Sequence, residues 1–260
     1  MKKTIKQLGN SFKKVGKSYH LGRRDYPKEL MKDITKISGI NKESSVLDVG
    51  CGTGKSTIPF TKTGAKLIGI DISGNMLKIA RELSANYKNI EYEQISFEKF
   101  SQPKSSFNLI LFGTSIHWLD SKMVYKRANF LLKKNGHVAL FWEPIGNLCK
   151  EIRLLGMEEI FTINCPNYPK SPYSMNIPKK RINEIIKSRL FAKPILKKYK
   201  ITQKYNLEEF LYLINSYSWV ISLNKNKKDK LMQEVKTFLS KKKITLKFRT
   251  EMYLIMAKRK

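Results

Sequence analysis

The chain has few cysteines, and none of them is spaced for a metal site or for a disulfide framework. Its 260 residues hold three, Cys51, Cys149 and Cys165, which are scattered along the sequence. Paired spacings such as C-x-x-C, which are typical of zinc sites, do not occur among them. Scattered single cysteines favour a reducing compartment, and we expect a cytoplasmic protein.

Long apolar runs are missing as well. No segment approaches the roughly 20 consecutive apolar residues that a membrane helix needs. The start, MKKTIKQLGNSFKK, is basic but has no apolar core, so it does not resemble a secretory signal. We therefore expect no membrane span. The length of 260 residues suffices for one sizeable core with a lid.

Acidic residues are scarce, since 21 Asp and Glu stand against 51 Lys and Arg and the formal net charge is +30. One interpretation is an acidic partner, such as RNA, an anionic lipid surface, an acyl carrier protein or a carboxylate substrate. The favoured alternative is a lysine-rich composition, because only nine of the basic residues are arginine, the better ligand for phosphates and bases. Residues 41–110 are close to neutral, with nine basic and seven acidic residues. RNA or an acidic carrier protein is therefore an open but unfavoured partner.

A glycine-rich turn follows an apolar run at Val46–Gly54, with the sequence VLDVGCGTG. A second apolar run, at 67–70, ends in Asp71. This order of strand, glycine turn, helix, strand and acid is typical of a nucleoside-cofactor site at the carboxyl end of a parallel sheet. Glycines let the backbone approach a ligand, and the second acid can accept hydrogen bonds from ribose hydroxyls.

Two phosphate-binding motifs fit the turn poorly. The dinucleotide motif G-x-G-x-x-G requires a glycine where this chain has Lys55. The phosphate-loop motif ends correctly at Gly54-Lys55-Ser56, but its first glycine would fall at Val49. Nucleotide binding and a vestigial site are therefore the minor alternatives for this turn.

The segment VLDVGCGTG closely resembles the first motif of class I S-adenosylmethionine (SAM)-dependent methyltransferases. The resemblance implies that Asp48 lies near the amino acid part of SAM, that the turn passes its methionine and ribose, and that Asp71 binds the ribose. The cofactor-binding set that it implies is Asp48, Gly50, Gly52, Thr53, Gly54, Asp71, Ile72, Met76, Ser96, Phe97 and Thr114.

Weaker resemblances extend over most of residues 12–260. Tyr19–Pro27 is similar to the Y-x-x-x-R-P-x-Y-P segment of small-molecule methyltransferases, with Arg24 in place of the first proline. Ser96-Phe97-Glu98 matches the adenine-side segment, and Gly113–Asp120 resembles F-H-W-x-D. Among such enzymes, the trans-aconitate and malonyl-carrier-protein methyltransferases are the most similar in pattern. None of these segments identifies the substrate.

The alternation of apolar runs and helix signals predicts an α/β fold, a Rossmann-like doubly wound sheet. Strands are expected at 45–49, 66–70, 90–94, 107–112, 137–142, 195–205 and 244–257, and helices from Pro27, near Gly54, after Ser73, from Asp120 to a stop at Gly136, at 207–216 and at 229–239. The family resemblance implies seven strands with the last one antiparallel. We divide the chain into an N-terminal arm and helix (1–40), a SAM-binding core (41–143), a lid inserted after strand five (144–190) and a C-terminal part of the sheet with basic helices (191–260).

Methyl transfer from a sulfonium needs an acceptor held close to the methyl group and water kept out. His117 is the one well-placed candidate base, although a structural or orienting role is favoured for it. Trp118 and Trp142 are candidates for the pocket wall, with core packing as the alternative. Arg23 and Arg24 are natural partners for a carboxylate, with a solvated face as the alternative. Tyr19 and Tyr26 can close over the cofactor or simply anchor the N-terminal arm.

Three absences narrow the class of enzyme. No Pro-Pro-Tyr or Pro-Pro-Phe motif of amino-methylating nucleic-acid enzymes follows strand four, no Pro-Cys nucleophile occurs, and no metal cluster is expected. We therefore predict a SAM-dependent methyltransferase acting on a small molecule, with O-methylation of a carboxylate or hydroxyl favoured. The alternatives are methylation of RNA or of a carrier-bound acyl group, and a SAM-binding protein without turnover.

Overall fold

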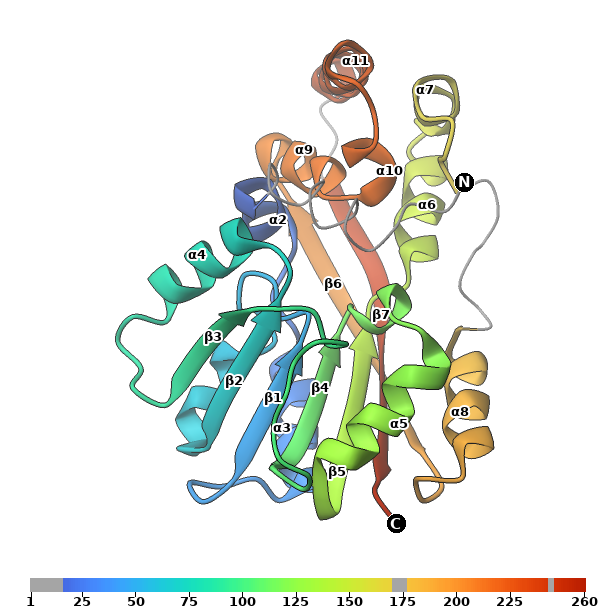
Figure 1. Ribbon diagram of the computed structural model, residues 1–260. Coiled ribbons are helices and arrows are strands. Elements are labelled where there is room, and N and C mark those ends of the chain that lie inside the picture. The colour runs from blue at the N-terminus through green and yellow to red at the C-terminus, as the bar shows by residue number, and fades with distance from the viewer. Residues whose placement is uncertain (1–15, 170–176, 243–245) are drawn as a thin grey trace.

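The computed structural model describes residues 16–169, 177–242 and 246–260. Its centre is a seven-stranded sheet in the order β3-β2-β1-β4-β5-β7-β6 (Figure 1). The strands are β1 (Ser45–Val49), β2 (Lys66–Asp71), β3 (Ile90–Gln94), β4 (Phe107–Gly113), β5 (Leu132–Trp142), β6 (Ile195–Tyr205) and β7 (Leu246–Lys258). β1 to β5 run parallel, whereas β7 is antiparallel to both of its neighbours, β5 and β6. The predicted Rossmann-like sheet with an antiparallel last strand is confirmed.

One face of the sheet is covered by α3 (Lys28–Ser38) and by the short 3₁₀ helix η1 (Ile58–Thr63). Leu30, Met31 and Ile34 of α3 are buried against it, and Gly39 ends the helix in a left-handed conformation. α4 (Gly74–Leu83) packs beside β2 and β3, and its N-cap Ser73 accepts a hydrogen bond from the Met76 N–H.

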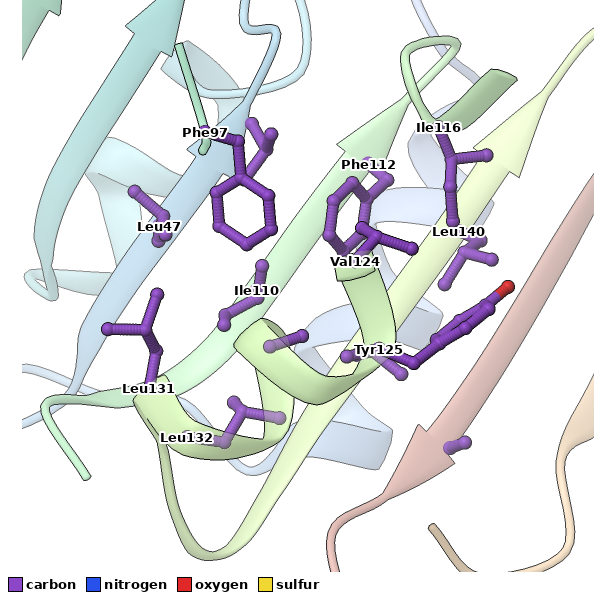
Figure 2. Packing of buried hydrophobic residues seen from close by; sticks show 14 of the residues in the cluster. Leu47, Phe97, Ile110, Phe112, Ile116, Val124, Tyr125, Leu131, Leu132 and Leu140 are labelled. Atoms are coloured by element: carbon purple, nitrogen blue, oxygen red, sulfur yellow. The ribbon is translucent and has the colours of Figure 1, made fainter. Parts of the chain in front are cut away.

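The other face carries α5 (Ser121–Leu131) and α8 (Ile177–Ser188). Side chains of α5 pack onto β4 and β5, as Figure 2 shows for Val124, Tyr125 and Leu131 beside Ile110 and Phe112. Asp120 caps α5 by accepting hydrogen bonds from the N–H groups of Lys122 and Met123.

A third core lies above the carboxyl ends of the parallel strands (Figure 1). It joins α6 (Ile145–Leu154), α7 (Glu158–Asn164), α9 (Leu207–Asn215), α10 (Ser218–Ile221) and α11 (Lys225–Lys242) with the upper ends of β6 and β7. We call these five helices the cap. α2 (Gly16–Gly22) packs against α9 so closely that a Cβ on Gly22 would lie 2.3 Å from the Leu213 nitrogen.

The structure departs from the sequence expectations in several helices. The helix expected near Gly54 is a series of turns leading into η1, because Pro59 stands where a longer helix would need a backbone donor. α5 ends at Leu131 rather than at Gly136, since Leu132 is already extended and begins β5. α2 and α10 were not expected. Within the predicted lid, α6 and α7 belong to the cap, whereas α8 packs on the sheet beside α5. Among the described residues, no helix is both long enough and apolar enough to cross a membrane.

Candidate functional site

The glycine turn after β1 has three residues with left-handed backbones, Gly50 at φ 70°, Gly52 at 56° and Gly54 at 82°. A Cβ on Gly50 would lie 2.6 Å from Cβ of Ser115, and one on Gly54 would lie 2.9 Å from the Tyr92 hydroxyl. A Cβ on Gly52 would meet no atom within 4 Å. Close packing therefore explains why Gly50 and Gly54 lack a side chain, whereas the space beside Gly52 is open to a ligand.

Asp71, at the end of β2, braces this turn. Its Oδ2 accepts a hydrogen bond from the Gly52 N–H at 2.9 Å, and its Oδ1 accepts one from the Ser73 N–H at 2.8 Å. A carboxylate has about four acceptor sites, so the group can still accept hydrogen bonds from a ligand. Burial raises the pKa of Asp71, and the backbone hydrogen bonds oppose that rise.

Asp48 lies beneath the turn and is fully buried. Its Oδ2 accepts hydrogen bonds from the hydroxyls of Ser56 at 2.5 Å and Thr57 at 2.6 Å. Within the described part of the chain, Oδ1 has no partner. Burial raises the pKa of Asp48 to about 6, although both hydroxyl bonds lower it. The supporting hydroxyls escaped the sequence analysis, although they follow the motif directly.

The other predicted cofactor residues differ in what their side chains do. The Thr53 hydroxyl lies 3.4 Å from Nδ1 of His20, and the Thr114 hydroxyl lies 2.9 Å from the Tyr26 hydroxyl. Ile72 and Ser96 offer backbone carbonyls to Gln94 and to the following turn. The side chains of Met76 and Phe97 are buried, and that of Phe97 belongs to the apolar core over β4 and β5. Ile72 directly follows β2, Thr114 directly follows β4, and Ser96 lies two residues beyond β3. These three residues are therefore at the carboxyl edge of the sheet, where the cofactor is predicted to bind.

The two arginines after α2 have different surroundings. Arg24 makes a bidentate pair with Glu209, at 3.0 and 2.7 Å, and its guanidinium lies 4.4 Å from the ring centroid of Tyr205. These contacts join α2 to α9, so they favour a structural role for Arg24 over the predicted substrate contact. Arg23 instead donates from Nε to the Ser216 hydroxyl at 2.8 Å and stacks 3.8 Å from the centroid of the Tyr217 ring.

Tyr19 links the cofactor side of the site to Arg23. Its ring centroid lies 5.6 Å from the Arg23 guanidinium carbon. Burial raises the pKa of Tyr19; Arg23 opposes this shift, and the charges of Asp71 and Asp48 add to it. The phenol is therefore near enough to sense the acids of the turn and the arginine together.

His117 lies in a 3₁₀ turn, η2 (Ile116–Trp118), just beyond β4, with its ring 4.5 Å from that of Trp118. The pKa of His117 is lowered by desolvation first and then by the charges of Arg181 and Arg23. The ring keeps exposed surface, which weakens the desolvation, but both guanidinium groups act in the same direction. The imidazole is therefore neutral at neutral pH.

The two tryptophans named from the sequence also differ. Trp142 is buried in the apolar core of the sheet, and its ring stacks on Tyr253 with the centroids 6.0 Å apart. This geometry supports core packing, the alternative to a pocket wall. Trp118 is half-buried beside His117.

Glu143 was not singled out by the sequence analysis, although it directly follows β5 at the same edge of the sheet. Its Oε2 accepts a hydrogen bond from Nε2 of Gln203 at 3.2 Å, and the carboxylate also bonds Thr250. Burial raises the pKa of Glu143, whereas Thr250 and Arg23 lower it. An acid directly after a strand was the signal that could have found it. Over residues 16–169, 177–242 and 246–260, no cluster of three His, Cys, Asp or Glu side chains could hold a metal ion.

Comparisons with known proteins agree with this geometry. Residues 46–136 match a family model described as a methyltransferase domain. An uncharacterized methyltransferase of Schizosaccharomyces pombe is 23% identical over 229 residues, which cover 88% of this chain and 86% of the relative. A demethylmenaquinone methyltransferase of Tropheryma whipplei is 42% identical over 76 residues, but these span only 29% of this chain and 31% of that protein.

Solved structures show the same fold. The YcgJ protein of Bacillus subtilis has a TM-score of 0.59 at 15% identity, covering 90% of this chain and 99% of its own. A phosphoethanolamine N-methyltransferase 2 of Haemonchus contortus in complex with SAM has a TM-score of 0.55 at 15% identity. That alignment covers 97% of this chain and 57% of the Haemonchus enzyme. Identities this low are a likeness of fold and say nothing of the acceptor.

Proposed function

The chain belongs to the class I SAM-dependent methyltransferases, and we propose that it transfers the methyl group to an oxygen of a small molecule that carries a carboxylate. SAM supplies an electrophilic methyl group on a sulfonium. The work of the protein is to bind that cofactor, orient the acceptor and exclude water.

Three features of the turn fit the cofactor. The open space at Gly52 admits a ligand against the backbone, and Asp71 has lone pairs left for the two ribose hydroxyls. Asp48 has a buried, unpartnered oxygen beneath the turn, at the position where the resemblance expects the amino acid part of SAM.

The observation that carries the acceptor proposal is the position of Arg23. Its charge acts on Tyr19, which also senses Asp71 and Asp48, and on His117 beyond β4. Arg23 also lies against the Tyr19 ring, with its guanidinium carbon 5.6 Å from the ring centroid, so its charge is close to the cofactor side of the site and acts on the candidate base as well. A guanidinium is a good donor for a carboxylate oxygen, and it would hold a carboxylate acceptor next to the cofactor site.

The acceptor decides what His117 does. A carboxylate is already a nucleophile and needs no base, so a neutral imidazole would only orient it. A hydroxyl must lose a proton, and a neutral imidazole can take it. The cap over the strand ends, with α2 packed against α9, supports the exclusion of water from the transfer.

The first test concerns the cofactor. SAM and S-adenosylhomocysteine (SAH) should raise the thermal stability of the protein, as ligands selective for the folded state do. ATP and NAD should leave it unchanged, because both phosphate motifs are incomplete. Saturable ATP binding without SAM binding would refute the cofactor assignment.

The second test concerns the acceptor. The enzyme is incubated with methyl-labelled SAM and a panel of small carboxylic acids, each paired with the neutral amide of the same skeleton. Release of SAH with a base-labile methyl ester on an acid, and none on its amide, supports the proposal. Transfer to the amides at the same rate as to the acids would contradict it.

A specific surface favours a second candidate, an anionic macromolecule as acceptor. One face of the β6–β7 ladder exposes Lys198, Lys200, Lys204, Lys247 and Arg249. Lys204 lies directly opposite Lys247, and like charges so placed destabilise a sheet. RNA binding that weakens steeply with salt, and is lost on reversing Lys200 and Lys204, would support this candidate. We also propose that the methyltransferase is cytoplasmic, since its three cysteines are free and buried.

A further inference from the structure

Arg23 and Glu143 are opposite charges that act on each other but do not pair. In the described residues, no acid lies within 4 Å of the Arg23 guanidinium and no base lies within 4 Å of the Glu143 carboxylate. The charge of Glu143 nevertheless raises the pKa of Arg23, and the charge of Arg23 lowers the pKa of Glu143. Both are half-buried, so leaving them apart is costly unless something else completes them.

Each group is fixed from behind by a partner of its own. Ser216 accepts from the Arg23 Nε, and the Tyr217 ring covers one face of its guanidinium. Gln203 and Thr250 donate to Glu143, and Gln203 is itself oriented by the Tyr205 hydroxyl at 2.8 Å. The anchors of Arg23 directly follow α9, and those of Glu143 come from β6 and β7, so each charge is held by a different part of the structure.

The neighbouring arginine provides an internal comparison. Arg24 follows Arg23 directly and closes into a bidentate pair with Glu209. Arg24 thus forms an ordinary ion pair, whereas the preceding residue, Arg23, has no acid within ion-pair distance among the described residues. Glu143 directly follows β5 at the carboxyl edge of the sheet. Arg23 lies against the Tyr19 ring, and its charge also acts on His117.

We propose that Arg23 and Glu143 form a two-point acceptor subsite, which takes a molecule bearing a carboxylate and, next to it, a hydroxyl or ammonium group. Arg23 holds the carboxylate, and Glu143 accepts a hydrogen bond from the second group. Glu143 is then a specificity-determining residue that selects against a plain carboxylate. This inference rests on the proposed function, whose acceptor it narrows.

A stability measurement separates this subsite from a structural ion pair. Glu143→Gln keeps an oxygen for Gln203 and Thr250 and removes a charge without a direct partner, so its melting temperature should equal or exceed that of the parent. Glu209→Gln, the matched control, breaks the pair with Arg24 and should melt lower. A larger drop for Glu143→Gln than for Glu209→Gln would show that Glu143 is a structural partner of Arg23 and overturn the proposal.

A ligand measurement uses three probes of one size, namely propionate, 3-hydroxypropionate and β-alanine. Saturation-transfer NMR on the full chain loaded with SAH should show at least fivefold stronger signals for one or both two-group probes than for propionate. The stronger of the two tells whether the second group is a hydroxyl or an ammonium. Glu143→Gln should remove the preference, and Arg23→Met should weaken all three.

Equal signals for the three probes, no signal from any, or an unchanged preference in Glu143→Gln would overturn the subsite. SAH loading is checked by its own signals, and no methyl transfer is required. A failure of the cofactor assignment is therefore distinguishable from a failure of the subsite.

Discussion

Replacing Asp48 by asparagine should make the protein more stable at neutral pH. Asp48 is fully buried, and one of its oxygens has no partner among the described residues. Burial raises its pKa from 3.8 to about 6, so the ionised form costs the folded chain about 3 kcal/mol at neutral pH. Asparagine cannot ionise, and its amide oxygen can still accept from the hydroxyls of Ser56 and Thr57.

The pH dependence fixes the sign of the effect. Because the folded pKa lies above the unfolded one, the folded chain binds the proton more tightly and the contribution of Asp48 to stability falls as pH rises. The cost is absent below about pH 4 and complete above about pH 6. The asparagine NH₂ takes the place of an oxygen that already lacks a partner, so we expect about 1–3 kcal/mol of the gain to remain.

Urea unfolding of parent and Asp48→Asn over this pH range is the assay. Only the difference between the two curves reports Asp48, because the histidines titrate in the same window with the opposite slope. Asp33→Asn is the matched control, since hydrogen bonds from Lys197 and Tyr199 lower the pKa of Asp33 and its loss should destabilise the protein above its titration. An Asp48→Asn protein that is less stable than the parent at pH 8, or a difference independent of pH, would refute the reasoning.

The same variant should bind SAM at least tenfold more weakly. A buried carboxylate that destabilises the fold is retained where it serves a ligand, which is the usual exchange of stability for function. Unchanged SAM affinity in a stabilised Asp48→Asn would leave the buried charge without a functional reason.

The central sheet was predictable because parallel strands that are buried on both faces have nearly continuous apolar sequences. Val46–Val49, interrupted only by Asp48, and Phe107–Phe112, interrupted only by Asn108, are of this kind, and they form the neighbouring parallel strands β1 and β4. Asp48 was singled out because it directly precedes the glycine turn, in the segment that resembles the first methyltransferase motif. The acids at the strand ends were predictable because these ends share one edge of the sheet.

The errors in the helices have local physical causes. A glycine turn normally leads into a helix, but Pro59 lacks the donor that the helix interior requires, so only a 3₁₀ segment forms. The position of Gly136 after an apolar helical pattern predicts a helix stop, whereas the residue lies inside β5, where a Cβ would be 3.0 Å from the Asn108 carbonyl oxygen. A glycine needed for close approach and a glycine needed for a turn look alike in a sequence.

The acceptor side could not be predicted, because its parts are far apart in the chain. Ser216 bonds Arg23 over 193 residues, and Gln203 bonds Glu143 over 60. Spacing and periodicity report neighbours on one element and not such contacts. For the same reason Arg23 and Arg24 look equivalent in the sequence, although Arg23 bonds Ser216 at the C-cap of α9 and Arg24 bonds Glu209 within α9.

Three further substitutions test the site. Asp71→Ala removes the acceptor for the ribose hydroxyls and should weaken SAM binding at least tenfold by calorimetry, charge-assisted bonds being worth about 1.5–3 kcal/mol each; unchanged affinity would place the ribose elsewhere. Gly52→Ala and Gly39→Ala put a Cβ into open space at similar positive φ, so both should lose a similar amount of stability, but only Gly52→Ala should lose SAM affinity. His117→Ala should cost about 10²–10⁴ in turnover with SAM affinity intact if the acceptor is a hydroxyl, because the imidazole then takes its proton. Since Arg181 and Arg23 lower the pKa of His117, the parent rate should stay flat as pH falls through 6.5, the ordinary value for histidine, and decline only at lower pH. A His117→Asn protein with full turnover across that range would show that His117 removes no proton, and the carboxylate acceptor held by Arg23 would then need none removed.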